Sequence, residues 1–476
     1  MLPLIEFRVL DINSECWGVS REKLMANAGR AVAEVISERF NVRKILVICG
    51  PGNNGGDGFA MAAVLGKTHE VTVCLLERPE NIKTEIAKKQ FRNCRKNCNV
   101  EMWEKIDGLL KSTELVVDAI FGTGLSRRPE GKYAGVIEKI NRSGKTVVSV
   151  DVPSGFPHQP AVKPALTVCF HALKEGMNVE NSGEIVVVPI GIPAEAETET
   201  NFGEFVFYRI PEKNSRKGDN GRVLVLGGGP YTGAPYFVAM AAYRTGADIV
   251  HVATQEEAYS VLRNYSPLLI VHKMPESKEE RLEFLRNLHK KFDVIVVGPG
   301  LGKERGIMET CTEFISIAEK PLVVDADAIP LLKDVKPRTG VLVTPHAGEF
   351  FDLTGIRVPE NLDERKEVVR EAARKHGFTI LLKGSVDVIS DGFSVKLNRT
   401  GNPGMTVGGT GDVLAGICAA LISKGCTPYQ AARLGAFISG LAGDAAFENY
   451  GYSLLPTDIL EELPEVIKKG LNKTRE

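Results

Sequence analysis

The sequence predicts an α/β protein of two domains, each built on a mostly parallel β-sheet with helices on both faces. Its 476 residues exceed what one hydrophobic core usually supports. Short β-branched runs such as RKILVICG, VTVCLL and TVVSVDVPSG alternate with amphipathic helical stretches, which is typical of parallel sheets. The composition, 43% hydrophobic and 25% charged, is that of an ordinary globular chain, so neither domain is expected to be disordered.

The domain boundary is expected within residues 194–214, where an acidic polar stretch carries no long periodic element. We expect a first domain over residues 1–200 and a second over residues 215–476. The second half repeats the strand pattern and adds an antiparallel hairpin that turns at Asp391-Gly392. After residue 408 the pattern predicts mainly helices.

Charge and cysteine content limit the function classes. Fifty-nine basic against sixty acidic residues give a net charge of -1, which argues against a broad surface for nucleic acid or anionic membranes. Nine scattered cysteines indicate reduced thiols in a cytosolic protein. The first residues do not read as a signal peptide, and no apolar run approaches the roughly 20 residues that span a bilayer. We therefore expect a cytoplasmic protein, a homo-oligomer, that binds small molecules.

A Gly-rich turn follows the strand KILVICG and leads into a helix near Phe59. In GPGNNGGDGFA the backbone can approach a ligand closely, and the first amides of the helix can point at an anion. The turn lacks the GxGxxG fingerprint, so a hydride-transferring site is not supported. Two later strands end at Asp118 and Asp151, and the carboxyl ends of parallel strands converge on one crevice. The alternative is a merely tight strand-to-helix turn.

The strongest single signal is NRTGNPGMTVGGTGDVLAGICAAL, residues 398–421. Gly408, Gly409 and Gly411 leave backbone amides free to form an anion hole at the start of a helix. Asp412 follows in the first turn, where it can accept a proton from a hydroxyl that attacks a phosphoryl group. Its alternative role is a helix N-cap. The pattern predicts phosphoryl transfer with Asp412 as catalytic base.

The first half also carries five motifs in order: LMANAG (24–29), GPGNNGGDG (50–58), VDAIFGTGLS (117–126), VDVPSG (150–155) and HALKEG (171–176). Together they resemble the NAD(P)H-hydrate epimerase family, a Rossmann-like domain, over nearly all of residues 1–200. The resemblance implies interconversion of the R and S forms of nicotinamide dinucleotides hydrated at C6. It implies K⁺ at Asn54, Asp118 and Ser154, with Asp151 facing the reacting ring. The implied substrate contacts are Asn53, Asn54, Gly55, Gly56, Asp57, Gly122, Thr123, Gly124, Leu125, Ser126, Arg127 and Arg128.

Two departures from that family stand in the first half. FPHQPAV follows VDVPSG where the family usually carries a longer LDADTG-like stretch, and Ala26 stands where an acidic residue is usual. They leave open whether the first domain is catalytic or a binding module that has lost its chemistry. The sequence leaves two interpretations of Lys174 in HALKEG, a role in the site or a plain surface charge.

The second half carries KGDNGRVLVLGGGPYTGAP (217–235), VVGPGLG (296–302), VVDADAI (323–329), VTPHAGEF (343–350), LLKGSVDVI (381–389) and TGNPGMTVGGTGD (400–412). These motifs resemble the ribokinase-like superfamily and, within it, the ADP- or ATP-dependent NAD(P)H-hydrate dehydratases, over residues 215–470. The resemblance implies substrate contacts at Ala234, Gly300, His346 and Asp412. The implied nucleotide site consists of Lys383, Gly384, Ser385, Val386, Asp387 and Gly411, with Gly408, Gly409 and Thr410 in the anion hole.

The two resemblances together predict a bifunctional enzyme that repairs hydrated NADH and NADPH. The first domain would epimerise the hydrates, and the second would dehydrate the S form with ADP as the expected donor, ATP remaining open. K⁺ and Mg²⁺ are the implied ions. The alternative is a ribokinase-like small-molecule kinase fused to a non-catalytic ligand-binding domain. The sequence leaves two interpretations of Asp325 and Asp327: they order the water shell of a magnesium ion, or they form hydrogen bonds within the sheet.

Overall fold

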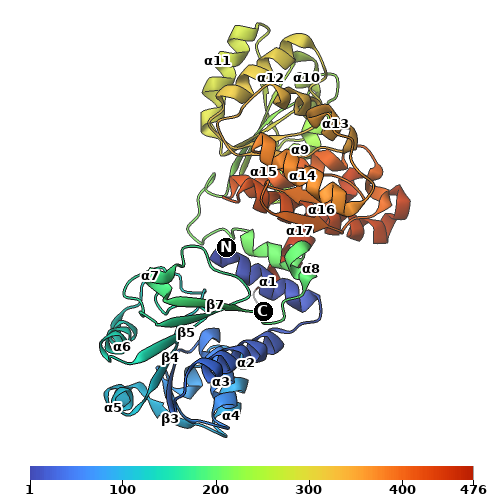
Figure 1. Ribbon diagram of the computed structural model, residues 1–476. Helices are drawn as coiled ribbons and strands as arrows, with labels where there is room; N and C mark the ends of the chain where they lie inside the picture. Colours follow the sequence, from blue (N-terminus) through green and yellow to red (C-terminus); the bar gives the residue numbers. More distant parts are fainter. Residues whose placement is uncertain (475–476) are drawn as a thin grey trace. The chain divides into compact units, whose positions relative to one another are not determined.

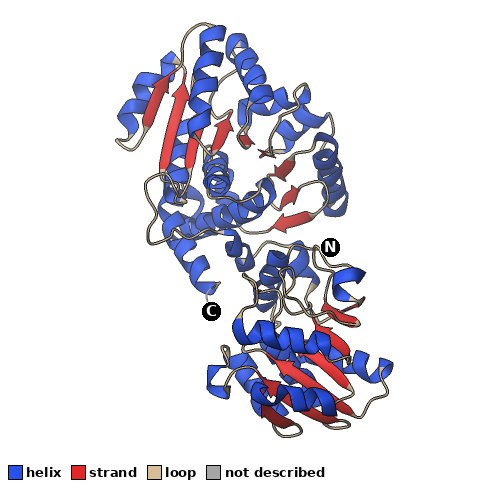
Figure 2. Cartoon of the chain, turned by 90° about the vertical axis from the view of Figure 1, so that its left-hand side faces the viewer, coloured by secondary structure: helices blue, strands red, loops and turns tan. Residues whose placement is uncertain are grey.

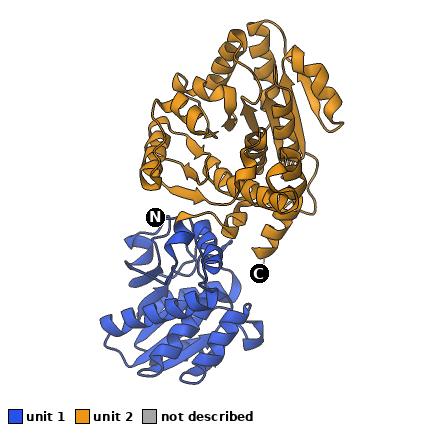
Figure 3. Ribbon diagram, turned by 90° about the vertical axis from the view of Figure 1, so that its right-hand side faces the viewer, with its two compact units in different colours: residues 1–197 blue, residues 198–476 orange. Residues whose placement is uncertain are grey.

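A computed structural model describes residues 1–474, and the chain divides into two compact units between Glu197 and Thr198 (Figure 3). Each unit is built on one β-sheet with helices packed on both of its faces (Figure 2), so the predicted α/β class is confirmed for both. None of the described helices is both long enough and apolar enough to cross a membrane.

The first unit has a seven-stranded sheet over its described residues, ordered β3-β2-β1-β4-β5-β6-β7, and every neighbouring pair is parallel. Its strands are β1 (Lys44–Cys49), β2 (Glu70–Leu75), β3 (Asn99–Met102), β4 (Leu115–Ala119), β5 (Thr146–Val150), β6 (Leu166–Phe170) and β7 (Glu184–Val188). Its helices are α1 (Leu4–Cys16), α2 (Arg21–Arg39), α3 (Asn53–Leu65), α4 (Glu85–Cys94), α5 (Ile106–Ser112), α6 (Gly131–Arg142), α7 (Val179–Ser182) and α8 (Ala194–Thr198).

Both faces of this sheet are buried, which explains why its strands are almost continuously apolar. In β1, Ile45 and Val47 pack into the core beneath α2, α3 and α4, whereas Leu46 and Ile48 pack into the core beneath α5 and α6. Figure 1 shows these two helix groups on opposite sides of the strands. The strand order reverses between β1 and β4, and the carboxyl ends of these two strands carry the Gly-rich turn and Asp118. Such a switch point is where α/β sheets bind ligands.

The second unit has a nine-stranded sheet over its described residues, ordered β10-β9-β8-β11-β12-β13-β14-β15-β16. Its strands are β8 (Arg222–Leu226), β9 (Ile249–Thr254), β10 (Ile270–Lys273), β11 (Val294–Val297), β12 (Leu322–Val324), β13 (Val341–Val343), β14 (Thr379–Leu382), β15 (Asp387–Ser390) and β16 (Val395–Asn398). Its α-helices are α9 (Gly233–Arg244), α10 (Glu256–Tyr265), α11 (Lys278–Leu288), α12 (Arg305–Ile317), α13 (Ala347–Thr354), α14 (Leu362–His376), α15 (Thr410–Ser423), α16 (Pro428–Tyr450) and α17 (Pro456–Lys473).

Pairing in the second sheet is parallel up to β14 and antiparallel beyond it. The predicted hairpin is therefore confirmed, and Gly392 occupies its turn with φ +91°. On one face the strands pack against α11, α12 and the 3₁₀ helix η5 (Ala326–Lys333), and the other face is covered by α9, α15 and α16. The predicted helical end of the chain is confirmed as α15, α16 and α17.

Residues 199–207, which the sequence suggests to be part of a connector, pack into the second unit. The 3₁₀ helix η3 (Phe202–Phe207) places Phe205 against Gly470, where an added Cβ would lie 2.2 Å from the ring. The Glu204 carboxylate is buried and forms a 2.8 Å ion pair with Arg433. A three-residue repeat brings Phe202 and Phe205 to the same side of η3. This spacing differs from the α-helical period, so the sequence pattern did not reveal the element.

Candidate active sites

In the first unit, close backbone approach explains the glycines of the turn after β1. An added Cβ at Gly50 would lie 2.0 Å from the Ile120 carbonyl oxygen, and one at Gly55 would lie 2.0 Å from the Gly50 carbonyl oxygen. The same geometry brings Gly122 against Asn54, with 3.1 Å between the Asn54 Oδ1 atom and an added Cβ. The turn over residues 50–58 and the beginning of the loop over residues 122–128 therefore meet. The end of that loop is exposed, and Arg128 pairs there with Glu130.

The three predicted cation ligands come together beside this turn. Asp118 is fully buried, and its Oδ2 atom accepts hydrogen bonds from the Ser154 backbone N–H and the Ser149 hydroxyl, each at 2.8 Å. The Ser154 hydroxyl accepts from the Phe121 N–H at 2.8 Å, next to Gly122 and therefore to Asn54. Burial raises the pKa of Asp118, and the hydrogen bonds from Ser154 and Ser149 counteract part of this rise.

The chemistry of this cluster suits a monovalent cation. Within residues 1–474, Asp118 has no ion-pair partner, and the buried Nδ2 atom of Asn54 has no hydrogen-bond partner. The same residues contain no group of three or more His, Cys, Asp or Glu side chains that could hold a metal ion. A cation bound here would therefore depend on one carboxylate together with amide, hydroxyl and carbonyl oxygens, which are hard ligands.

Asp151 lies just beyond β5 and is joined to a buried lysine. Its φ of +67° is unusual for a non-glycine residue, a kind of strain that clusters at functional sites. Its Oδ1 atom accepts hydrogen bonds from the Phe170 N–H at 3.1 Å and from the Lys174 ammonium. Lys174 is fully buried and also donates to the Phe170 carbonyl at 2.8 Å. The interpretation of Lys174 as a surface charge is therefore wrong.

Two further carboxyl groups surround this pair. Asp57 lies in the first part of α3, and burial followed by the charge of Asp151 raises its pKa well above the usual value. Asp11 lies in α1, and burial followed by the charge of Asp151 raises its pKa to about 7. Asp11 belongs to none of the motifs recognised in the sequence. Only the packing of α1 brings it to this site.

In the second unit, α15 begins at the Gly-rich motif as predicted. Gly409 is the residue before the helix and has φ +105°, and an added Cβ at this position would lie 3.1 Å from the Phe237 ring. An added Cβ at Gly411 would lie 3.3 Å from the Lys383 Nζ atom. Gly409 is thus the N-cap of α15, and Asp412 lies within the first turn without a side-chain cap bond. The alternative that Asp412 is the N-cap is therefore wrong.

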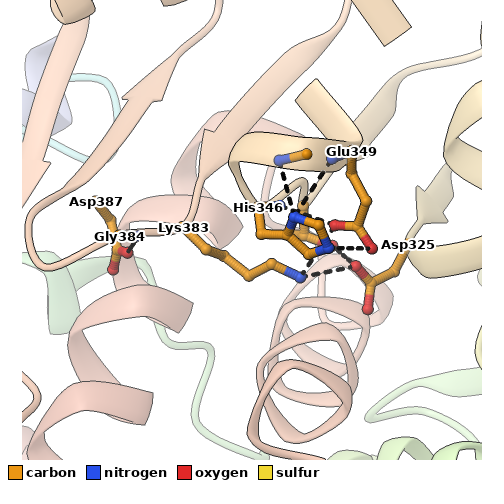
Figure 4. A network of polar contacts seen from close by, with 8 residues as sticks. Asp325, His346, Glu349, Lys383, Gly384 and Asp387 are labelled. Carbon is orange, nitrogen blue, oxygen red and sulfur yellow. Dashed lines mark hydrogen bonds and ion pairs between the residues drawn. The ribbon is translucent and has the colours of Figure 1, made fainter. Parts of the chain in front are cut away.

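Lys383 joins the carboxylates around the start of α15 (Figure 4). Its Nζ atom lies 3.1 Å from Asp325 Oδ1 and 3.8 Å from Glu349 Oε2. Burial works against the charged form of Lys383, but Asp325 and Glu349 outweigh it and raise the pKa of the ammonium group. Burial, and then the charge of Asp325, raise the pKa of Asp412 to about 7, while Lys383 opposes the shift. Asp412 therefore combines a position at a helix N-terminus with the near-neutral pKa expected of a general base.

His346 is exposed and is the N-cap of α13. Its Nδ1 atom accepts from the Gly348 N–H at 3.0 Å, and its Nε2 atom lies 3.4 Å from Glu349 Oε1. This capping role explains the residue locally, and substrate contact stays a prediction. The Asp325 carboxylate accepts a hydrogen bond from the Thr344 hydroxyl at 2.8 Å and also pairs with the Lys383 ammonium group. It therefore links the ends of β12 and β13 to Lys383.

The remaining predicted contacts lie in segments that follow the strands, with Ala234 in the first turn of α9 and Asp387 at the start of β15. Gly300 lies against α9, with 3.3 Å between an added Cβ and the Ala234 Cβ atom, so these two predicted substrate contacts are neighbours. Asp327 accepts from the Gly302 N–H at 2.9 Å and fixes that loop. In the turn after β14, Asp387 accepts from the Gly384 N–H at 3.0 Å, and burial raises its pKa to about 6. Figure 4 shows this turn on the far side of the Lys383 stem from the carboxylates.

Known proteins resemble the chain over both units. The profile of the NAD(P)H-hydrate dehydratase family matches residues 223–465, and that of the YjeF-related protein N-terminus matches residues 21–176. The chain is 41% identical to the bifunctional NAD(P)H-hydrate repair enzyme of Pyrobaculum aerophilum, with 98% of this chain and 97% of that protein covered. It is 40% identical to the enzyme of the same name from Archaeoglobus fulgidus, with 97% of each chain covered.

Solved structures resemble the second unit. A ribokinase-like superfamily protein from Enterococcus faecalis is 28% identical with a TM-score of 0.51, covering 57% of this chain and 96% of that chain. The ADP/ATP-dependent NAD(P)H-hydrate dehydratase of Bacillus subtilis, co-crystallised with ATP/Mg²⁺, is 26% identical with a TM-score of 0.50. That match covers 56% of this chain and 96% of the other. The predicted ribokinase-like fold of the second unit is confirmed.

Proposed function

This chain belongs to the family of bifunctional NAD(P)H-hydrate repair enzymes, and on that premise we propose that its two units restore hydrated NADH and NADPH in succession. The first unit epimerises the R and S hydrates at C6, and the second dehydrates the S form. Hydration at C6 produces both epimers, whereas a phosphoryl-transfer site accepts one, so the first unit makes the whole damaged pool available to the second. The observation that carries this proposal is Asp412, a carboxyl group with a pKa of about 7 in the Gly-rich first turn of α15.

In the dehydration, Asp412 accepts the proton of the C6 hydroxyl as that oxygen attacks the terminal phosphoryl group of the nucleotide. Phosphate then replaces hydroxide as the leaving group. The C6–O bond breaks, C5 loses a proton, and the C5–C6 double bond of the reduced nicotinamide is restored. We infer that the amides of residues 408–411 and the ammonium group of Lys383 hold the phosphoryl charge. Mg²⁺, brought in with the nucleotide, would supply further positive charge.

We infer that ADP is the phosphoryl donor, because the resemblance of the second half is to dehydratases whose prokaryotic members generally use it. The related Bacillus subtilis enzyme is named as ADP/ATP-dependent, so ATP is the second candidate. We also infer that the reaction takes place in the cytoplasm, since the nine cysteines are all free thiols and most are buried.

In the epimerisation, Asp151 would exchange protons at the C6 position of the ring, held in place by Lys174 and the Phe170 N–H. We infer that residues 53–57 and 122–128 bind the dinucleotide, with its phosphates at the start of α3. Asn54, Asp118 and Ser154 would hold K⁺, which would compensate the buried Asp118 charge beside that turn.

The proposal is tested by incubating the full-length protein with a mixture of hydrate epimers and ADP and following recovery of reduced-nicotinamide absorbance. We expect both epimers to be converted, and no conversion without a nucleotide. Inorganic phosphate should appear in step with the reduced cofactor. A phosphorylated product that accumulates instead would favour the small-molecule kinase. Conversion of the S form alone would favour a first unit that only binds its ligand.

A further inference from the structure

We propose that Asp11 is a second proton-carrying group in the first unit, acting on the face of the nicotinamide ring opposite Asp151. This inference rests on the proposed epimerisation and adds to it a residue outside all the motifs recognised in the sequence. It follows from the way α1 packs, from the partners of the Asp151 carboxylate, and from the proton transfers that inversion at C6 requires.

Packing of α1 directs Asp11 toward the Asp151–Lys174 pair. Leu2, just before the helix, donates to the Leu173 carbonyl and accepts from the Glu175 N–H, both at 2.9 Å, so the beginning of the chain lies along the segment that carries Lys174. The Phe7 ring lies 4.3 Å from the Lys174 Nζ atom. Asp11 follows Phe7 by four residues, one helical turn, and therefore extends from the same side of α1.

The Asp11 carboxylate is partly buried, and within residues 1–474 it has neither a hydrogen-bond donor nor an ion-pair partner. Two cations act against the rise in the pKa of Asp11, Arg21 of α2 and then Lys174, and Arg21 forms a 2.9 Å ion pair with Glu15. The charged groups around Asp11 are thus Asp151 and Lys174 beyond the strands, Asp57 in α3, Arg21 in α2 and Glu15 on its own helix. An unpaired carboxyl group in these surroundings is costly as an anion, and its pKa of about 7 lets it carry a proton at neutral pH.

Asp151 by itself cannot serve both faces of a ring. Its Oδ1 atom is fixed by the Phe170 N–H and by Lys174, which is itself immobilised by the Phe170 carbonyl. Epimerisation requires a proton to reach the departing hydroxyl on one face and to leave the incoming water on the other. Two proton-carrying groups with different protonation preferences fulfil this requirement. Burial raises the pKa of Asp11 to about 7, so Asp11 begins as the acid.

The step balances without any further reactant. Asp11 donates its proton to the C6 hydroxyl, the C6–O bond breaks, and water leaves as the ring nitrogen supplies an electron pair to form an N1–C6 iminium cation. Water then adds to C6 from the other face, and Asp151 takes up its proton. The reverse epimerisation uses the same groups with their roles exchanged. The Asp11–Asp151 pair holds one proton before and after the reaction and none while the iminium cation exists, and proton exchange with solvent returns the proton from Asp151 to Asp11.

The test compares Asp11→Asn with Glu15→Gln in the full-length protein. Both remove one acidic group from α1, but Glu15 is exposed and lies one turn farther along. Starting from each purified epimer, we expect Asp11→Asn to lower the turnover number of epimerisation by ~10²-fold or more, with little change in KM. Glu15→Gln should change it by less than about threefold. The wild-type rate should fall as the pH rises above about 7, where the pair loses its proton, and this fall should be absent from the residual activity of Asp11→Asn.

Nucleotide-dependent dehydration of the S epimer by Asp11→Asn should equal that of the wild type, which shows that the second unit is unaffected, and an unchanged urea-unfolding transition of the first unit shows that this unit is folded. Normal epimerisation by Asp11→Asn, or an unchanged alkaline fall in its rate, would overturn the proposal. Loss of that fall in Asp57→Asn instead would also overturn it, because Asp57 would then carry the proton. Failure of the wild type to epimerise either form would refute the proposed function of the first unit itself.

Discussion

Replacing Asp412 with asparagine should abolish dehydration while making the second unit more stable at alkaline pH. Asparagine keeps the size of the side chain but cannot accept the hydroxyl proton. A positioned general base contributes ~10² to 10⁴ in rate, or roughly 3 to 5.5 kcal/mol of barrier. Because the Gly-rich start of α15 is unchanged, nucleotide affinity should persist, and the defect should appear in turnover.

The gain in stability follows from the shifted pKa of Asp412. The pKa of Asp412 rises from 3.8 to about 7, which without solvent screening corresponds to about 4 kcal/mol against the charged form of the carboxyl group. Solvent screening at this partly exposed carboxyl group reduces the figure to about 1 to 2 kcal/mol. The folded state binds the Asp412 proton more tightly than the unfolded state does. The unfolding free energy of the wild type therefore falls by this amount as the pH rises from about 4 to about 7. Asp412→Asn should therefore match the wild type at pH 4 and exceed it at pH 8.

Single-turnover dehydration, nucleotide titration and urea unfolding at both pH values check these expectations. Asp391→Asn is a matched control, since Asp391 lies in the β15–β16 turn and its Oδ1 atom accepts backbone N–H groups that asparagine can also satisfy. The control should turn over normally and show no pH-dependent gain. Near-normal turnover in Asp412→Asn would remove this residue from catalysis and, with it, the phosphoryl-transfer mechanism.

Three further predictions concern the remaining buried charges. Asp118→Ala should weaken epimerisation and its dependence on K⁺ over Na⁺ while sparing dehydration; equal epimerisation by the wild type in both salts would exclude a K⁺ role. Asp151→Asn should slow epimerisation by ~10²-fold or more, and early unfolding with full activity in the folded fraction would show a structural role instead. Glu204→Gln removes the carboxylate that forms a 2.8 Å ion pair with buried Arg433 and should lower the unfolding free energy of the second unit by about 3 to 5 kcal/mol. The control is Glu465→Gln, which breaks the exposed ion pair with Lys468 and should lower the unfolding free energy in urea by less than about 1 kcal/mol. An equal loss in the two variants would contradict a stabilising role for the buried Glu204–Arg433 pair.

Local sequence patterns predicted most of the fold because they follow from short-range geometry. Continuous apolar runs such as those of β1 and β11 require burial on both faces, and this indicated parallel sheets between helix layers. The Asp391-Gly392 turn and the Gly-rich start of α15 are fixed within a few residues, so both were found without tertiary information. The connector was the weakest prediction, since the short 3₁₀ helix η3 has no α-helical period.

The sequence by itself determined the two α/β units, the order of the motifs, the strand ends at which Asp118 and Asp151 stand, and the helix start that carries Asp412. Tertiary structure alone decided the partners and protonation of these groups. Lys174 became a buried ion-pair partner of Asp151 across 23 residues, and Glu204 became the partner of Arg433 across 229. Asp11 reached the first site through the packing of α1, and Asp412 acquired its pKa from burial beside Asp325. The reason is physical: periodicity and turn chemistry act over a few residues, whereas desolvation and charge pairing depend on which distant segments the core brings together.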